Sequence, residues 1–293
     1  NNDNDDDGNT PQLAADERQL QFYNDAANLV LVACHSLMRV EKKKWMGDPL
    51  DLACFEHVQN DWTYNAKQQS FDSEFAKVWV LKTFPFDPQL RTSSALILVQ
   101  QKKKKKKKNG TDVDDDEDDE SFGLYQLIKG SPQPLGEQFL NWNNTAEKAS
   151  NAANATWYKN QITELGRDGY RMVGMGIAKA SPELTARVFP NTGLPTTKKE
   201  VKRYLAPTNQ NSLPLRLLQR HAVETPGTFD FCGLICLTAQ LRPSTPRVIA
   251  QLKRRVGVAM VTGDTVEAAV AVAQQSNILP KTTTTNDDDD DDG

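Results

Sequence analysis

Three short segments of the chain combine charged or hydroxyl side chains with glycine or proline, a pattern typical of loops that hold phosphate groups. Lys129-Gly130 places a cation beside a flexible turn at the end of an apolar run. Thr262-Gly263-Asp264 joins an apolar run to an alanine-rich helical pattern, where a hydroxyl group and a helix N-terminus suit a phosphoryl group. Asp48 and Asp51 flank a proline and offer carboxylates to the amine or ribose of a nucleotide.

Two more residues fit the same nucleotide chemistry. Phe86 lies in the irregular stretch Phe84–Pro88 and is placed to stack on an aromatic base, an interaction of about 1–3 kcal/mol. Arg171 begins a strand-like run after Gly169 and suits a phosphate. Each candidate also has an ordinary structural explanation: a core phenylalanine, a helix-capping aspartate, a solvated arginine or lysine, or a turn glycine. No single candidate decides between the two.

The charge of the 293-residue chain is concentrated in tracts. Its 35 basic and 39 acidic residues give a net charge of −4. Seven lysines form Lys102–Lys108, and eighteen acids lie in Asp3–Asp7, Asp112–Glu120 and Asp287–Asp292. Such runs cannot bury apolar surface and are typical of disordered segments. Without them 28 basic and 21 acidic residues remain, so the part expected to fold has a net charge of +7.

Composition also disfavours several classes of protein. No apolar run approaches the ~18 residues of a membrane-spanning helix, and no secretory signal is visible. The four cysteines lack Cys-x-x-Cys spacing, which favours buried thiols in a reducing compartment over a metal site or a disulfide. The three histidines have no second ligand at helical spacing, so we expect no metal site built from these groups. As a separate expectation, nucleic acid is not among the partners of this chain.

The hydrophobic pattern predicts a mixture of helices and strands. The expected helices span residues 25–37, 49–58, 142–168, 200–205, 246–254 and 266–276. The expected strands span residues 78–81, 94–99, 122–130, 171–180, 228–237 and 256–261, and the rest of 180–225 is loop-rich. The charged segment lies between two expected strands. We therefore expect an enlarged hairpin loop, because lengthening a loop costs free energy only logarithmically.

The order of these elements predicts an α+β fold in two parts. Most of the chain has the pattern of an antiparallel sheet with flanking helices. The last section has the order helix, buried strand, turn, helix, which is typical of a parallel, doubly wound sheet. Ligands of such sheets bind beyond the carboxyl ends of the strands, where Thr262 lies. We expect the chain to pass into the beginning of a Rossmann-like domain there.

Seven motifs in order resemble one known family. They are ACHSL (33–37), GDPLDLACFE (47–56), FPFDPQLRTSS (84–94), LIKGSP (127–132), LGRDGYRMVGMGIAK (165–179), FCGLICLTAQLRPSTPRVIAQL (231–252) and AMVTGDTVEAAVAVA (259–273). Together they resemble the nucleotide-binding domain of P-type ATPases and the segment that returns into the HAD-type phosphorylation domain. The first two motifs are similar to type V members. The last two look closer to the B branch, the polyamine-type exporters, than to the A branch.

The resemblance implies four parts. They are a low-complexity lead-in over 1–24, a nucleotide-binding domain over 25–241 with a disordered insert at 101–121, a partial phosphorylation domain over 242–280, and a low-complexity tail over 281–293. The implied function is that of the ATP-binding module of a pump. Such a pump couples ATP hydrolysis, through an aspartyl-phosphate, to the transport of an organic cation. The implied partners are ATP, Mg²⁺ and the rest of the pump.

The implied location is the cytosolic face of an intracellular membrane, either of late endosomes, lysosomes or vacuoles or, for the A branch, of the endoplasmic reticulum. The transported substrate would be selected by membrane helices that this sequence does not contain. The membrane would therefore be reached only through those segments.

The resemblance also implies roles for individual residues. In the nucleotide pocket, Phe86 would stack on adenine, Lys129 with Gly130 would line the pocket, Arg171 would contact the phosphates, and Asp51 with Asp48 nearby would hold the adenosine. Arg91 would replace a basic residue that the family carries one position later. At the phosphoryl group, Thr262 with Gly263 would bind the γ-phosphate, and Asp264 would position it with its magnesium ion.

The chain departs from the family at several points. Gln133 stands where an acid is common, and Thr265 stands where an asparagine is common. The Asp-Lys-Thr-Gly-Thr loop with the phosphorylated aspartate and the Gly-Asp-Gly-x-Asn-Asp loop of the magnesium site are not in the sequence. Phosphoryl transfer needs a positioned nucleophile and a metal, so we expect the chain to bind ATP without turning it over.

Three alternatives remain open at this point. The first is the A-branch pump, which dislocates membrane helices from the endoplasmic reticulum. The second is a nucleotide-binding module that never turns over, and the third is a scaffold that associates through its charged tracts.

Overall fold

A computed structural model describes residues 25–41, 44–102, 121–139, 148–190, 192–206, 213–225, 228–238 and 240–281. The predicted lead-in, nearly all of the charged insert and the tail after Lys281 lie outside the described residues. The chain divides into two compact units. The first contains residues 1–155 and 173–235, and the second contains residues 156–172 and 236–293.

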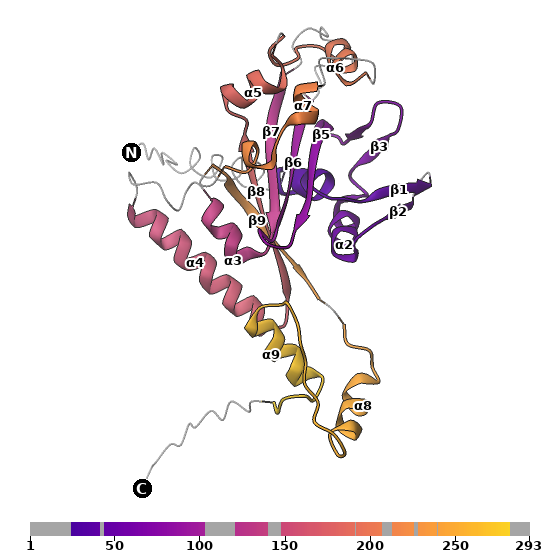
Figure 1. Ribbon diagram of the computed structural model, residues 1–293, viewed down its shortest axis with the longest axis vertical. Helices are drawn as coiled ribbons and strands as arrows, with labels where there is room; N and C mark the ends of the chain where they lie inside the picture. The colour runs from indigo at the N-terminus through magenta and orange to yellow at the C-terminus, as the bar shows by residue number, and fades with distance from the viewer. Residues whose placement is uncertain are drawn as a thin grey trace, which may run out of the picture. The chain divides into compact units, whose positions relative to one another are not determined.

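Seven strands form one sheet in the order β3-β4-β5-β6-β7-β8-β9 (Figure 1). They are β3 (Thr63–Asn65), β4 (Ser70–Asp72), β5 (Ala76–Asp87), β6 (Thr92–Gln101), β7 (Ser121–Gly130), β8 (Arg171–Lys179) and β9 (Asp230–Leu237). Neighbours from β3 to β8 are antiparallel. A separate hairpin pairs β1 (Met38–Glu41) with β2 (Lys44–Met46). The chain is thus a mixed α+β protein, as the pattern predicted.

The hairpin around the charged insert is confirmed. Strands β6 and β7 pair without a break from Thr92↔Gly130 to Gln101↔Ser121. Since Gln101 and Ser121 belong to the strands, the insert predicted over 101–121 was one residue too wide at each end.

Strand β5 is longer than predicted. The expected strand ended at Leu81, with a loop through Phe84–Pro88, whereas β5 continues to Asp87. Its pairing with β6 shifts between Val80 and Lys82 and again between Phe84 and Asp87. A proline has no N–H for a strand ladder but is tolerated where the pairing is irregular. The sequence signal for a loop therefore marked a local distortion within a strand.

The described helices agree in part with the prediction. They are residues 25–33, α2 (Pro49–Val58), α3 (Pro132–Leu135), α4 (Lys148–Arg167), α5 (Pro182–Val188), α6 (Lys198–Leu205), α7 (Leu213–Leu217), α8 (Thr245–Leu252) and α9 (Val266–Gln275), with 3₁₀ turns η1 (Gly136–Gln138) and η5 (Arg220–Ala222). Three elements, α5, α7 and η5, were missed in the region predicted to be loop-rich. The first helix ends at residue 33, four residues early, because the chain then enters β1, where Met38 is exposed.

The first unit buries side chains on both faces of its sheet. On one face, Leu96, Leu98 and Leu124 pack in a cluster with residues of α5, α6 and α7, among them Val188 and Tyr204. Side chains alternate between the faces of a strand, so Ser93 and Lys129 lie on the opposite face. There they meet the residues that follow the first helix and those of α2, which lies beside the β1–β2 hairpin in Figure 1.

The buried parallel strand predicted over 256–261 is absent. These residues have no strand or helix, and Val256 and Val261 are exposed. A parallel strand is stable only between paired neighbours, and no described strand pairs with this run. The expectation of a Rossmann-like piece was therefore wrong for its strand, although both flanking helices, α8 and α9, are present. Among the described helices, none has the length and apolar character needed to cross a membrane.

Candidate functional site

A buried ion pair joins two of the segments that the sequence marked as candidates. Lys129 Nζ, from the end of β7, lies 2.7 Å from Asp51 Oδ1 in the first turn of α2. Their side chains are 3% and 16% exposed. The structural alternative of a solvated strand-end lysine is therefore wrong. Among the described residues, none accepts a hydrogen bond from Nζ with favourable geometry, so the ammonium group keeps donor capacity beyond the ion pair.

The segment Cys34–Ser36 completes this cluster. The backbone N–H of Ser36 donates to Asp51 Oδ2 at 3.1 Å, which leaves the two carboxylate oxygens with different partners. Asp48 is instead the N-cap of α2, since its Oδ1 accepts from the N–H groups of Leu50 at 2.9 Å and Asp51 at 3.3 Å. Two motifs that are close in the sequence, 33–37 and 47–56, thus meet the distant motif 127–132 at one end of the sheet.

His35 is a functional candidate that the sequence analysis missed. Its ring centroid lies 5.2 Å from that of Phe55 and 5.9 Å from that of Trp45, and its Nδ1 accepts from the Leu37 N–H at 3.2 Å. No described residue bonds to the buried Nε2. Burial, and secondarily the charge of Lys129, lowers the pKa of His35 to about 4, so the ring is neutral at pH 7. The signal in the sequence was its place beside Cys34 in a candidate motif.

The prediction that the cysteines are buried thiols is confirmed for three of the four residues. Cys34, Cys54 and Cys232 are buried, whereas Cys236 is exposed, and all four are free thiols. The Cys34 thiol donates to the carbonyl of Ser93 at 3.4 Å, and burial raises the pKa of Cys34 to about 12. Since the thiolate is the reactive form, Cys34 is a structural residue rather than a nucleophile.

Phe86 lies near the ion pair by strand register, and its side chain is exposed. The β5–β6 pairing runs from Phe84↔Ser94 to Asp87↔Thr92, which places Pro85 and Phe86 opposite Ser93. Ser93 pairs on its other side with Lys129. Adjacent strands lie about 4.8 Å apart, so Phe86 and Lys129 are separated by about two strand spacings. The Phe86 side chain is 58% exposed, which suits a stacking platform and argues against the alternative of a core phenylalanine.

Arg91 and Gly130 meet through their backbones. Arg91 lies in the β5–β6 turn with φ of 56°, its N–H donates to the Asp87 carbonyl at 2.7 Å, and its own carbonyl accepts from the Ser131 N–H at 3.0 Å. A Cβ atom at Gly130 would lie 2.2 Å from that Arg91 carbonyl oxygen. Gly130 is thus required for the close approach of two chain segments, and this requirement is independent of any ligand.

The remaining candidates belong to the second unit and form their own cluster. Arg171 Nη2 lies 2.9 Å from Asp264 Oδ1, and the Thr262 hydroxyl donates to Asp264 Oδ2 at 3.0 Å. Arg171 is therefore paired with a carboxylate in this structure. A Cβ at Gly263 would meet no atom within 4 Å, so the fold itself does not require a glycine there. The cluster precedes α9, whose N-cap is Thr265.

The Thr262–Asp264 cluster offers few ligands to Mg²⁺. Mg²⁺ favours carboxylate oxygens, and Asp264 supplies one carboxylate, both of whose oxygens already have partners. Within the described ranges, no group of three or more His, Cys, Asp or Glu side chains is arranged to hold a metal ion. These residues alone therefore form only part of a magnesium site.

Comparison with known proteins adds no assignment. No family model matches this chain, and no curated protein matches its sequence.

Proposed function

We propose that this chain is the nucleotide-binding module of a type V P-type ATPase, with the beginning of the phosphorylation domain after it. The observation that carries the proposal is the ion pair between Asp51 and Lys129. These residues come from two motifs that were assigned to one nucleotide pocket on sequence resemblance alone. Their meeting at the end of an antiparallel sheet, together with Cys34–Ser36, supports that assignment.

In the first unit, the proposed site binds the adenosine end of ATP. The exposed Phe86 ring would stack on adenine, and Asp51 would accept a hydrogen bond from the nucleotide. The ammonium group of Lys129 would donate to an anionic oxygen once binding uncovers its buried Nζ atom, and Arg91 supplies an exposed cation in the β5–β6 turn. Gly130 and Asp48 would act indirectly. Gly130 lets the backbone of the β5–β6 turn approach the end of β7, and Asp48 caps α2.

In the second unit, the proposed role concerns the phosphoryl group. The Thr262 hydroxyl and the backbone of Gly263 would bind a phosphoryl oxygen, and Arg171 would move from Asp264 to the phosphates. Asp264 would then offer an oxygen to the Mg²⁺ that accompanies ATP. The ion supplies charge neutralisation at the transferred phosphoryl group when the rest of its site is present.

Catalysis by the intact pump would require the Asp-Lys-Thr-Gly-Thr loop, which this sequence lacks. The chain by itself therefore binds ATP without forming an aspartyl-phosphate. In the intact protein, this module would serve an exporter of organic cations, of the B branch, on the cytosolic face of a late endosomal, lysosomal or vacuolar membrane.

The proposal is tested by titrating ATP into the full chain, followed by calorimetry and NMR. We expect saturable, weak binding, and we expect Phe86→Ala to weaken it about 5- to 150-fold, the equivalent of one stacking interaction. Leu90→Ala is the matched control, because Leu90 is similarly exposed in the neighbouring turn and has no proposed role. Absence of saturable binding, or equal affinities for wild type and Phe86→Ala, would overturn the proposal.

A second measurement examines turnover. Incubation with radiolabelled ATP should leave no acid-stable label on the chain. A stable acyl-phosphate on any aspartate would contradict the assignment of this chain as a module without its nucleophile.

A further inference from the structure

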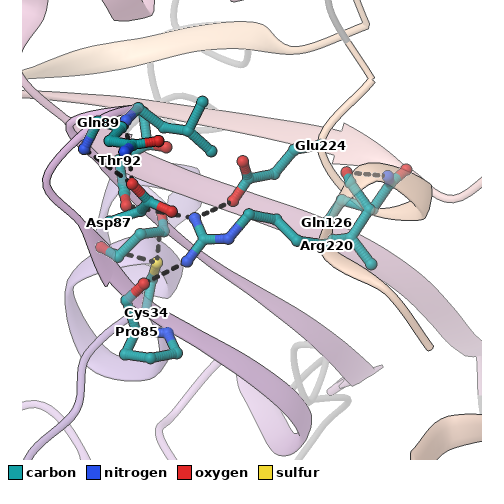
Figure 2. Close-up of polar contacts among 11 residues, drawn as sticks. Cys34, Pro85, Asp87, Gln89, Thr92, Gln126, Arg220 and Glu224 are labelled. Carbon is teal, nitrogen blue, oxygen red and sulfur yellow. Dashed lines mark hydrogen bonds and ion pairs between the residues drawn. The ribbon is translucent and has the colours of Figure 1, made fainter. Parts of the chain in front are cut away.

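Arg220 connects the 3₁₀ turn η5 to the distorted end of β5. Figure 2 shows its guanidinium group between Glu224 and the backbone of Pro85. Nη1 donates to Glu224 Oε1 at 2.8 Å and to the carbonyl of Thr92 at 3.3 Å, and Nη2 donates to the carbonyl of Pro85. One side chain therefore binds β5, β6 and its own turn.

The bond to Pro85 lies where the sheet itself is irregular. The β5–β6 pairing is interrupted between Phe84 and Asp87, so the backbone there lacks the regular ladder that holds the rest of the strand. Arg220 supplies a charge-assisted donor to a carbonyl in this interval, and such bonds are stronger than neutral ones. Phe86, the next residue, is 58% exposed and has little packing of its own to fix its position.

The charge of Arg220 is matched by its surroundings. Its side chain is 21% exposed and that of Glu224 is 9% exposed, so the two opposite charges form a largely buried pair. The guanidinium carbon also lies 5.8 Å from the centroid of the Phe84 ring, within the range of a cation–π contact. The pKa of Asp87 is lowered chiefly by the N–H groups of Leu90 and Gln89, with a smaller contribution from Arg220.

The turn that carries Arg220 is itself fixed to the sheet. Val223 is fully buried, and its carbonyl accepts a hydrogen bond from the Gln126 side chain of β7. Within the turn, the Glu224 N–H donates to the Arg220 carbonyl at 2.8 Å. The guanidinium group thus reaches β5 from a turn that is anchored to β7, which is the arrangement expected of a residue that positions another.

We propose that Arg220 is a positioning residue for Phe86. It holds the Pro85 carbonyl so that the Phe86 ring stays presented beside the Asp51–Lys129 pair, and it thereby sets the affinity for the base of a purine nucleotide. The inference rests on the function proposed above for the first unit. It adds a residue that lies outside the seven motifs on which the resemblance was based.

The main test is a double-mutant cycle between Arg220→Gln and Phe86→Ala in the full chain, with ATP affinity as the readout. Alone, Arg220→Gln should weaken ATP binding roughly fivefold, and by no more than Phe86→Ala does, because it acts only through the stacking interaction. In the Phe86→Ala background it should cause no further loss. Arg220→Lys should retain only part of the affinity, because an ammonium group cannot reproduce the planar fork. A residue that only stabilised the fold would add its full effect in both backgrounds.

Arg216→Gln is the matched control, since Arg216 is an exposed arginine of the preceding helix α7 and its substitution makes the same charge change. It should leave ATP affinity unchanged. Equal effects of Arg216→Gln and Arg220→Gln, or full additivity of Arg220→Gln with Phe86→Ala, would overturn the inference. If Arg220→Gln does not fold, the cycle is made with Arg220→Lys, whose unfolding transition is recorded alongside.

An arm without nucleotide separates this inference from the proposed function. NMR relaxation of the Phe86 ring, in protein labelled at phenylalanine, should show greater motion in Arg220→Gln than in wild type or Arg216→Gln. Unchanged ring motion overturns the positioning role even if ATP binds. If the ring motion increases but the chain does not bind ATP, the positioning of Phe86 by Arg220 is supported and the proposed function is overturned.

Discussion

Lys129 Nζ at the end of β7 and Asp51 Oδ1 in the first turn of α2 lie 2.7 Å apart, with the lysine side chain only 3% exposed. Removing one partner of a buried ion pair leaves an uncompensated charge, whereas replacing both by apolar groups is often tolerated. The pair therefore makes the stability of the first unit depend on two residues that we also propose for nucleotide binding.

The first prediction concerns this pair. Asp51→Asn should destabilise the chain by about 3 kcal/mol or more, because Lys129 would stay buried without its counter-charge. The double variant Asp51→Leu with Lys129→Met should lose less stability than Asp51→Asn. Urea unfolding followed by tryptophan fluorescence measures both. Asp264→Asn serves as the comparison: its partner Arg171 is 57% exposed, so we expect a loss below about 1 kcal/mol.

The second prediction concerns His35 and pH. Its folded pKa is about 4, below the ordinary value near 6.5, so the unfolded chain binds a proton more readily than the folded one. The stability contributed by neutral His35 is fully present above about pH 6.5 and is lost as the pH falls towards about 4. The loss amounts to at most about 3 kcal/mol.

The measurement is the free energy of unfolding between pH 7 and pH 4 in wild type and His35→Leu. Carboxylates titrate in the same range, so the informative quantity is the difference between the two curves. The free energy of unfolding of wild type minus that of His35→Leu should decrease as the pH falls. Parallel curves for wild type and His35→Leu would disprove the assignment.

The third prediction concerns Gly130. An alanine Cβ there would lie 2.2 Å from the Arg91 carbonyl oxygen, a clash with backbone that no side-chain rotation relieves. Gly130→Ala should therefore cost at least about 1–3 kcal/mol, the usual range for overpacking. Gly257→Ala is the control, because a Cβ at Gly257 meets no atom within 4 Å. Equal unfolding midpoints for the two variants would contradict the close approach.

The fourth prediction concerns the charged insert. Replacing residues 103–120 by a Gly-Asn-Gly linker should preserve the β6–β7 register and keep Lys102, whose Nζ donates to the Ser73 carbonyl at 2.6 Å. Because loop closure depends on the logarithm of length, the gain in stability should not exceed about 2 kcal/mol. Circular dichroism and thermal unfolding check this. Loss of the fold would show that the insert has a structural role.

Local features of the sequence predicted the elements whose stability is local. Asp48 and Pro49 mark the beginning of α2 because a cap and a fixed φ act within one turn, and Thr265 caps α9 in the same way. The alternation of apolar and polar residues around the insert predicted β6 and β7, because this period of two residues can also be recognised within a short segment. Short helices such as α5 and α7 carry too few residues for a clear period, and they form where apolar side chains meet the sheet cluster.

The amino-acid sequence by itself therefore determined the α+β class and the hairpin around the charged insert, and it marked the residues that we propose for nucleotide binding. Only the tertiary structure decided which of those residues meet. It pairs Asp51 with Lys129 and Arg171 with Asp264, gives Arg220 a hold on the carbonyl beside Phe86, and leaves Val256–Val261 exposed instead of in a strand. The physical reason is the separation along the sequence of the residues that interact. Caps and periodicities act over a few residues, whereas these ion pairs and strand pairings depend on partners brought together by the whole fold.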